Sequence, residues 1–403
     1  MTDDEKAGHM NNSKGSFSDL VVLDMTRYLP GAYATQLLAD LGAEVIKVED
    51  TKKGDFCRYD FPTINGVSYY FTALCRNKKS ISLDLKNPEA NEAFLKLAAT
   101  ADIIVESFRP GAAKRLGVDY ESIKKINPRI VYCSYSAFGQ SDPRSLKALH
   151  DINMQGQAGY LAINGGRTSP IHMCDIASAM VAAQGMLAAL YNRERTGEGS
   201  YVDVSMFDSF VWWNSMVDSR YHFNGEVQEA QDLEYPAVCY NIYDTKDNQK
   251  ISFAMVEEKF WRTFCTDAGL EELIPVQLCR RQEAPEAFEK MERFVASKTL
   301  DEWKQWLEGK DICVAPVASK AEAIKNIVES GTGMMKYCDF PITGRVLQTN
   351  IPHKISSLPA SLDDVRPPPA LGQNNLEILI RLGYTKGDAQ KMAADGAINA
   401  VVE

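Results

Sequence analysis

The first half of the chain alternates between short apolar runs and longer stretches whose apolar residues recur every three or four positions. Short apolar runs bounded by polar residues predict buried strands, and the longer period predicts amphipathic helices. The runs predict strands over 20–25, 43–50, 80–86, 102–108 and 129–139, with helices over 31–42, 87–101 and 111–117 between them. Strands that alternate with helices in this way are typical of a doubly wound parallel sheet.

Local signals mark where two of these helices begin or end. Asn87 followed by Pro88 is typical of an N-cap residue and the first helical position. Gly42 is a stop signal for the helix over 31–42. A long helix is predicted over 176–195. Its most apolar part, 176–191, is too short to span a membrane, so we expect a helix buried in the core.

The pattern changes in the second half of the chain, and the change predicts a second domain. After residue 235, short strands are followed by three helices and a further apolar run, which favours a smaller α/β domain. Two more helices are predicted within 372–398, after a proline-rich connector. We therefore divide the chain into a disordered lead-in at 1–17, the first part of a large domain at 18–220, a small domain at 235–345 and a C-terminal segment at 346–403 that returns to the large domain.

Composition is that of an ordinary globular protein and argues against several kinds of partner. The formal net charge of −10 argues against nucleic acid or a membrane as the main partner, although a small anionic ligand needs only a local basic cluster. None of the nine cysteines falls in a C-x-x-C pair, so we expect reduced thiols and no metal site. The N-terminus lacks the apolar core of a secretion signal and the tail lacks a peroxisomal signal, so a cytoplasmic location is expected.

The turn after the first strand lacks the glycines of a dinucleotide site. It reads TRYLPGAYAT, with a single glycine, Gly31, and a basic residue, Arg27. No G-x-G-x-x-G follows the strand, and the chain contains neither a Walker A loop nor a G-x-S-x-G turn. Amides at a helix N-terminus can still hold a ligand at such a turn. We therefore predict a Rossmann-like large domain without a nicotinamide fingerprint.

Three residues are candidates for acid–base chemistry. His150, in the sequence HDIN, can act as a base near neutral pH, although a lone histidine more often caps a helix or bonds a backbone carbonyl. Asp175 begins the long apolar helix and is followed by small residues that would let a substrate approach; the alternative is an N-cap aspartate. Glu257 lies where a strand meets a helix, and alone it would be interpreted as a solvated first-turn glutamate.

Several longer stretches resemble one enzyme family in the same order. VVLDMTRYLPGAYATQLLADLGAEVIKVED, ADIIVESFRPGAAKRLGVDY and YNRERTGEGSYVDVSMFDS resemble blocks of the class III CoA-transferase (CaiB/BaiF) family, which includes the α-methylacyl-CoA racemases. The resemblance covers residues 18–385. It implies a two-domain chain that forms an interlocked homodimer, an acyl-CoA substrate that brings coenzyme A with it, and no tightly bound cofactor. It also implies that Arg76 and Arg109 lie near the nucleotide and phosphates of CoA, where arginine suits phosphate oxygens. The alternative for either arginine is a surface ion pair.

The family contains two chemistries, and the sequence leaves both open. In the racemases a base removes the proton α to the thioester carbonyl and an acid returns one; His150 with Glu257, and Asp175, match that set. In the transferases the aspartate that matches Asp175 attacks the thioester, a mixed anhydride forms, and CoA passes to a second acid.

Motifs in this chain favour one chemistry or the other. HDIN favours racemisation of a 2-methylacyl-CoA, which we take as the first hypothesis. The sequence CDIASAM and the short segment between residues 150 and 175 are more transferase-like and support the alternative. A CoA-ester-binding protein without activity is the non-enzymatic alternative, and it is disfavoured because all three acid–base positions are filled.

Overall fold

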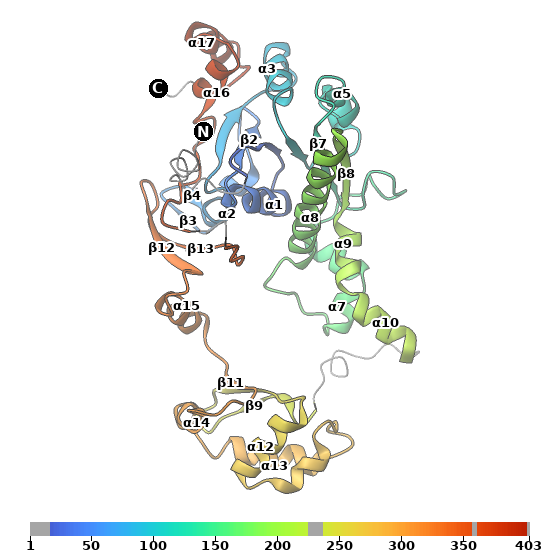
Figure 1. Ribbon diagram of the computed structural model, residues 1–403, viewed down its shortest axis with the longest axis vertical. Helices are drawn as coiled ribbons and strands as arrows, with labels where there is room; N and C mark the ends of the chain where they lie inside the picture. The colour runs from blue at the N-terminus through green and yellow to red at the C-terminus, as the bar shows by residue number, and fades with distance from the viewer. Residues whose placement is uncertain (1–16, 225–236, 357–360, 401–403) are drawn as a thin grey trace, which may run out of the picture. The chain divides into compact units, whose positions relative to one another are not determined.

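The computed structural model describes residues 17–224, 237–356 and 361–400, which form two compact units. The large unit comprises Met1–Gly159, Thr168–Met216 and Ser330–Glu403, and the small unit comprises Tyr160–Arg167 and Val217–Glu329. The chain therefore leaves the large unit twice, briefly at Tyr160–Arg167 and again at Val217–Glu329, and returns to it each time. Figure 1 colours the chain by residue number. Except for Phe17, the predicted lead-in at 1–17 lies outside the described residues.

A six-stranded sheet forms the centre of the large unit, in the order β5-β2-β1-β6-β7-β8. All neighbouring strands are parallel, so the predicted parallel sheet is confirmed. β1 lies between β2 and β6, and ligands of such sheets bind outside the carboxyl ends of the strands where the order reverses in this way. The strands are β1 Val21–Met25, β2 Glu44–Glu49, β5 Lys79–Ser82, β6 Ile103–Glu106, β7 Val131–Ser136 and β8 Ser200–Ser205.

Helices pack on both faces of this sheet. Alternate residues of β1 point to opposite faces, so Val22 packs in a core shared with α1 and α8, whereas Leu23 packs in a core shared with α3, α16 and α17. The Asn87 side chain accepts hydrogen bonds from backbone N–H groups of α3, and Pro88 is its first residue, which confirms the predicted cap. The helices of this unit up to residue 213 are α1 Leu29–Asp40, η2 Phe56–Arg58, α2 Tyr69–Leu74, α3 Pro88–Ala98, α4 Ala112–Leu116, α5 Tyr120–Lys124, α6 Asp151–Gln157, α8 Met173–Thr196 and α9 Met206–Trp213. The strands β3 Thr63–Ile64 and β4 Val67–Ser68 form a small hairpin.

α8 has 24 residues and is longer than predicted. It is the one helix among the described residues that is long and apolar enough to cross a membrane, and half of its apolar window is buried inside the chain. Ala179, Ala182 and Met186 pack in the core, and the buried Arg193 near its end bonds Asp102 at 3.0 Å. These are the contacts of the core helix that we expected.

The C-terminal segment covers the edge of the sheet at β5. The Asn374 N–H donates to the Ser80 carbonyl at 2.9 Å, and the Asn375 side-chain oxygen accepts from the Ser82 N–H at 2.8 Å. An edge strand that stays uncovered can pair with another chain. The segment then forms α16 Asn375–Arg381 and α17 Lys386–Ala394, which confirm the two helices predicted within 372–398.

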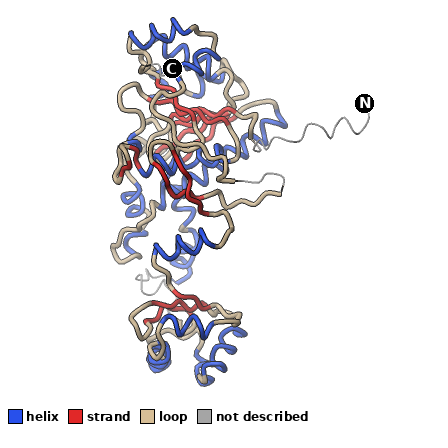
Figure 2. Tube along the Cα trace, turned by 90° about the vertical axis from the view of Figure 1, so that its left-hand side faces the viewer, coloured by secondary structure: helices blue, strands red, loops and turns tan. Residues whose placement is uncertain are grey.

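The small unit has a three-stranded antiparallel sheet in the order β11-β10-β9. The strands of this sheet lie together on one side of two helices of the unit, α12 and α13 (Figures 1 and 2). Trp261 and Trp303 are fully buried in its core. The elements are α7 Tyr160–Ile163, β9 Tyr240–Asp244, β10 Lys250–Ala254, α12 Glu258–Ala268, η3 Glu271–Val276, α13 Pro285–Val295, α14 Leu300–Leu307, β11 Val314–Pro316 and α15 Lys320–Glu329, and α10 Ser215–Asn224 crosses the boundary between the units.

The hairpin of β12 Met335–Phe340 and β13 Gly344–Thr349 belongs to the large unit, although the predicted small domain ran to 345. The Arg76 guanidinium donates to the Gln348 side-chain oxygen at 3.1 Å and to the Thr349 carbonyl at 2.8 Å. These bonds hold the hairpin on the large unit. The predicted boundary at 345 is therefore corrected to Glu329.

Candidate active site

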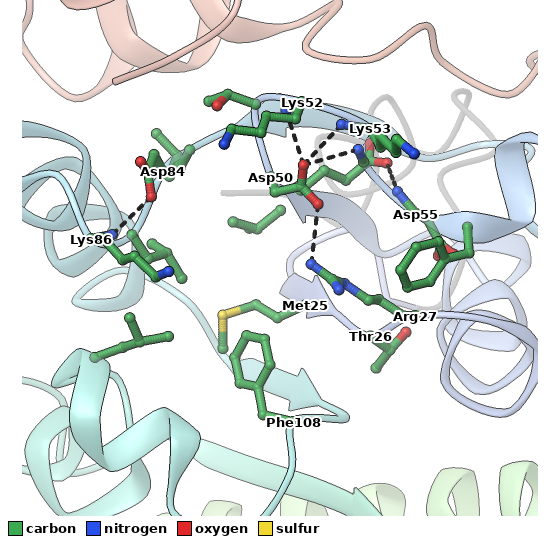
Figure 3. Close-up of a pocket in the computed structure, with 18 residues that line it drawn as sticks. Met25, Thr26, Arg27, Asp50, Lys52, Lys53, Asp55, Asp84, Lys86 and Phe108 are labelled. Atoms are coloured by element: carbon green, nitrogen blue, oxygen red, sulfur yellow. Dashed lines mark hydrogen bonds and ion pairs between the residues drawn. The ribbon is translucent and has the colours of Figure 1, made fainter. Parts of the chain in front are cut away.

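A cavity of about 460 Å³ opens at the carboxyl ends of β1, β2 and β5 (Figure 3). Met25 and Phe108 form part of an apolar wall, and Lys52, Lys53 and Lys86 contribute basic groups. Within the described part of the chain, the ammonium groups of these three lysines form no ion pair. An apolar wall can pack against a flat ring system, and lysine ammonium groups can bind phosphates. The cavity therefore suits a nucleotide with its phosphates.

Asp50 fixes the loop that carries two of these lysines. Its Oδ1 accepts from the backbone N–H groups of Lys52 and Lys53, both at 2.9 Å, and its Oδ2 accepts from the Arg27 guanidinium at 3.1 Å (Figure 3). Burial opposes ionisation of Asp50, but the backbone N–H groups hold the pKa of this carboxyl below its usual range. The loop after β2 and the turn after β1 are thereby joined at the mouth of the cavity.

Four charged side chains are buried beneath the turn between β1 and α1. Lys47 Nζ lies 2.7 Å from Asp55 Oδ2, and Lys78 Nζ lies 3.0 Å from Asp24 Oδ2; none of the four side chains is exposed. Burial opposes ionisation of Asp24, but Lys47 and Lys78 hold its pKa well below the usual range. Removing one member of such a cluster leaves a buried charge without compensation, so the cluster holds the turn firmly.

Tyr28 connects this cluster to the cavity and to His150. Its backbone N–H donates to Asp55 Oδ1 at 3.0 Å, and its φ of 61° lies in a region that non-glycine residues rarely adopt. Its ring stacks on Phe56, which lines the cavity, with centroids 5.3 Å apart, and meets the His150 ring edge-on at 6.3 Å. The cavity and His150 are therefore linked through one side chain.

His150 is the N-cap residue of α6, with its imidazole exposed. Its backbone N–H donates to the Asn153 side-chain oxygen at 3.1 Å. The position at the start of a helix thus agrees with the structural alternative for this histidine. The ring remains accessible to a ligand, so the catalytic role stays a prediction.

Asp175 lies in the first turn of α8, and it is not the residue that caps this helix. Asp151 Oδ1 accepts from the Cys174 N–H at 2.7 Å and from the Asp175 N–H at 3.2 Å. Within the described residues, the Asp175 carboxylate accepts no hydrogen bond. Burial and the neighbouring Asp151 charge raise the pKa of Asp175 to about 7. The site thus contains a half-buried carboxyl group that changes its charge near neutral pH.

Other titratable groups surround this pair. His172 Nδ1 lies 3.9 Å from Asp151 Oδ2, and its ring lies 6.2 Å from that of Tyr70. Burial raises the pKa of Tyr70, and the charge of Asp175 adds to the effect. Side-chain atoms of Asp151, His172 and Asp175 come within 4.8 Å of one another. Asp151 accepts hydrogen bonds from backbone N–H groups at the start of α8, where His172 and Asp175 also lie, and we attribute the short distances to this common position. The absence of a metal stays a prediction.

The structure leaves the predicted role of Glu257 open. It is the N-cap residue of α12 in the small unit, and its side chain is exposed. This agrees with the alternative of a solvated glutamate at a helix start. Orientation of His150 by Glu257 stays a prediction.

The two arginines assigned to CoA lie in different environments. Arg109 is exposed beside a second cavity of about 280 Å³, together with Lys114 and the buried Glu106. The pKa of Glu106 is raised to about 7, chiefly by burial. Arg76 is buried and bonded to Asp40 at 2.5 Å and to the β12–β13 hairpin. A CoA contact for Arg76 stays a prediction, and it would require some of these bonds to be exchanged.

The model of one protein family, CoA-transferase family III, matches residues 17–375. The chain belongs to this family. A succinyl-CoA:glutarate CoA-transferase of Mus musculus is 30% identical over 390 residues, which are 94% of this chain and 89% of the relative. A succinyl-CoA–D-citramalate CoA-transferase of Chloroflexus aurantiacus is 28% identical over 393 residues, which are 94% of this chain and 97% of the relative. The crystal structure of a CaiB/BaiF family protein from Brucella suis superposes with a TM-score of 0.80 at 25% identity, covering 92% of this chain and 100% of that one.

As a member of CoA-transferase family III, the protein is an enzyme that acts on CoA thioesters. The resemblance identified from the sequence is thereby confirmed. The named relatives are CoA-transferases and not racemases, so they support the alternative reaction rather than the racemisation that HDIN favoured.

Sequence reasoning missed two residues of the site in this family member. Asp151 was visible beside His150, but nothing in a linear pattern shows that its carboxylate reaches the start of a helix beyond residue 170. Tyr28 lies in the first turn, where only its unusual φ distinguishes it. Both depend on contacts between distant segments, which residue spacing does not encode.

Proposed function

We propose that the protein transfers coenzyme A between two carboxylic acids, with Asp175 as the nucleophile. The observation that carries this proposal is the Asp175 carboxylate, which is half-buried and accepts no hydrogen bond from the described residues. Its pKa of about 7 keeps it largely ionised slightly above neutral pH and makes it more basic than an ordinary aspartate. A more basic carboxylate is a stronger nucleophile toward a thioester carbonyl.

The proposed cycle has four steps that balance. Asp175 attacks the donor thioester carbonyl and the C–S bond breaks. CoA thiolate is released, and the acyl group is joined to Asp175 as a mixed anhydride. The thiolate then attacks the Asp175 carbonyl carbon, which releases the donor acid and leaves Asp175 as a CoA thioester. The acceptor carboxylate attacks this thioester, releases CoA thiolate again and forms a second mixed anhydride, between the acceptor and Asp175. Attack of the thiolate on the acceptor's carbonyl forms the new acyl-CoA and frees Asp175.

We propose that CoA binds with its nucleotide in the cavity at the ends of β1, β2 and β5. Support comes from the apolar wall at Met25 and Phe108 and from the unpaired lysines of that cavity. Arg109 is exposed at the end of β6, where it can meet a phosphate. The acyl donor and acceptor follow from the relatives only by analogy, and on that ground we propose succinyl-CoA and a dicarboxylic acid.

The first experiment combines turnover with trapping of the intermediate. The protein is incubated with succinyl-CoA and, in turn, glutarate and citramalate, and acyl-CoA products are measured by mass spectrometry. Hydroxylamine is added to convert the thioester on Asp175 to a hydroxamate that peptide mapping locates. We expect transfer and modification at Asp175 and neither in Asp175→Asn, whereas Asp142→Asn, the same charge change in a half-buried ion pair with Arg144, keeps both. Tight CoA-ester binding without turnover would instead support the non-enzymatic alternative.

Racemisation is the second candidate, and the exposed imidazole of His150 favours it. The enzyme is incubated with (2R)- or (2S)-2-methylacyl-CoA in heavy water without an acceptor acid. Deuterium at the α-carbon with loss of stereochemistry, absent in His150→Ala, would establish racemisation and overturn the transferase proposal. Absence of exchange together with CoA transfer is the result that we expect.

We also propose that the enzyme forms a homodimer. Trp212, Met216 and Phe223 on α9 and α10 are 62%, 80% and 85% exposed in the single chain. Apolar side chains gathered on two consecutive helices in this way usually mark an interaction surface. A second copy of the chain is the partner that the family resemblance implies.

A further inference from the structure

The start of α8 binds a carboxylate that belongs to another helix. Asp151, the first residue of α6, is 7% exposed and accepts the N–H groups of Cys174 and Asp175 on one oxygen. Its other oxygen accepts the side-chain amide of the buried Gln155 at 2.5 Å. Three donors face this carboxylate, which suits its ionised form because only that form is an acceptor at both oxygens.

We propose that Asp151 is a positioning residue for Asp175. Its carboxylate takes the backbone donors at the start of α8, so the Asp175 carboxylate accepts no hydrogen bond from the residues that the structure describes and is available to a thioester carbonyl. An aspartate in the first turn of a helix otherwise gains from these same donors, which would lower its basicity. This inference rests on the proposed function, in which Asp175 is the nucleophile.

Asp151 also acts through its charge. Burial disfavours the ionised form of Asp175, and the charge of a second carboxylate close by adds to this effect. Both causes act in the direction of the raised pKa of Asp175. Asp175 must form a bond to an acyl carbon and later release it, so a basicity between that of an ordinary carboxylate and a thiolate suits both steps.

Other titratable groups around Asp175 are the phenol of Tyr70 on α2, the imidazole of His172 before α8 and the thiol of Cys174. Burial raises the pKa of the Cys174 thiol and the pKa of Tyr70, which favours their neutral forms. His172 is exposed, and its Nδ1 lies 3.9 Å from Asp151 Oδ2. Asp151 is therefore the group whose removal is expected to change the proton affinity of Asp175 most.

The test measures the titration of Asp175 directly. The full-length protein is labelled with carbon-13 at the aspartate side-chain carboxyl, and the resonance missing from Asp175→Asn is assigned to Asp175. Its midpoint is compared in the wild type, Asp151→Asn and Asp151→Ser. Asparagine and serine both retain an oxygen that can cap α8 but carry no charge. We expect both variants to lower the midpoint by about one pH unit or more, a tenfold change in proton affinity.

Two further variants separate capping from charge. Asp151→Ala removes both, so the midpoint should fall at least as far as in Asp151→Asn and the melting temperature should fall as well. Asp142→Asn removes a half-buried charge, paired with Arg144, from the segment before α6 and should leave the midpoint unchanged. An unchanged midpoint in Asp151→Asn and Asp151→Ser, both folded by circular dichroism, would overturn the inference.

Activity provides the second readout. With succinyl-CoA and glutarate, the acid limb of the kcat/KM profile of Asp151→Asn should move to lower pH with the NMR midpoint. Its kcat at pH 8 should fall by about threefold, because a nucleophile that is tenfold less basic loses roughly the square root of that factor in rate. A wild type without transfer activity would overturn the proposed function alone, and the NMR titration would still decide the role of Asp151.

Discussion

In the proposed cycle Asp175 acts once as a nucleophile and again as a leaving group, and its surroundings set the balance between these roles. The carboxyl group is half-buried, has Asp151 as a neighbour and has lost the helix donors to it. Its identity as a candidate could be predicted because an aspartate precedes a long apolar helix. That its carboxylate accepts no hydrogen bond from the described part of the chain could not be predicted, because this depends on Asp151, which reaches the start of α8 from α6.

The raised pKa of Asp175 predicts a pH dependence of stability. A carboxyl group whose pKa is higher in the folded than in the unfolded state binds its proton more tightly when folded, so stability falls as pH rises from the usual value of 3.8 to about 7. Asp175→Asn removes this loss. We expect the variant to melt at least about 2 °C higher than the wild type at pH 8, with a smaller difference at pH 5. An equal difference at both pH values in thermal scans would contradict the assignment.

Arg109 provides a prediction about binding. If it meets a CoA phosphate, Arg109→Ala should raise the KM for the acyl-CoA by about tenfold with little change in kcat, since one charge-assisted bond is lost from both ground and transition states. Arg129→Ala, an exposed arginine paired with Glu194 at 3.2 Å, serves as the matched control. Steady-state kinetics in which both variants retain the wild-type KM would exclude the contact.

At the scale of elements, the strands and helices of the parallel sheet followed from apolar periodicity and from capping signals such as Asn87. Local chemistry determines these features, so the sequence contains them. The predicted boundary at 345 cut through the hairpin β12–β13, because the linear pattern does not show which unit the hairpin joins. Bonds between distant segments, such as those to Arg76, show which unit it joins.

The connection from α8 to β8 predicts a strong effect of a small substitution. A Cβ added to Gly199 would lie 2.0 Å from the Ile130 carbonyl oxygen and 2.6 Å from the Arg129 carbonyl carbon, and backbone atoms cannot yield as a flexible side chain does. Gly199→Ala should therefore lower the free energy of unfolding by about 2–4 kcal/mol in urea titrations. A Cβ added to Gly185, which lies in α8, would meet one side-chain atom of Val202 at 3.0 Å. Gly185→Ala should therefore change the free energy of unfolding by less than about 1 kcal/mol. Equal effects would show that the close backbone approach is not limiting.

At the scale of the whole molecule, fold class and family could be inferred from the order of the sequence blocks. The acyl group could not, because residue types alone do not specify a pocket for it. Trp212 and Phe223 illustrate the limit: aromatic residues are usually core, yet these are exposed in the single chain. The expected cytoplasmic location stays a prediction.

The exposed apolar residues predict the oligomeric state. Light scattering after gel filtration should give twice the mass of one chain for the wild type. Trp212→Glu combined with Phe223→Lys should lower it toward that of a single chain, because burying charged groups without partners is unfavourable. Ile126→Lys, which replaces a half-exposed apolar residue after α5, should leave the dimer intact. A wild-type protein that elutes as a monomer at all concentrations would contradict the dimer.

The return of the chain to the large unit has a consequence for its synthesis. The edge of β5 is covered by Asn374 and Asn375, and core positions near it are filled by residues up to Ile398. A ribosome therefore finishes the small unit before it has made the part that completes the large one. Until translation ends, the nascent large unit presents an unprotected strand and an incomplete core. The large unit, whose synthesis begins first, is therefore expected to finish folding after the small unit.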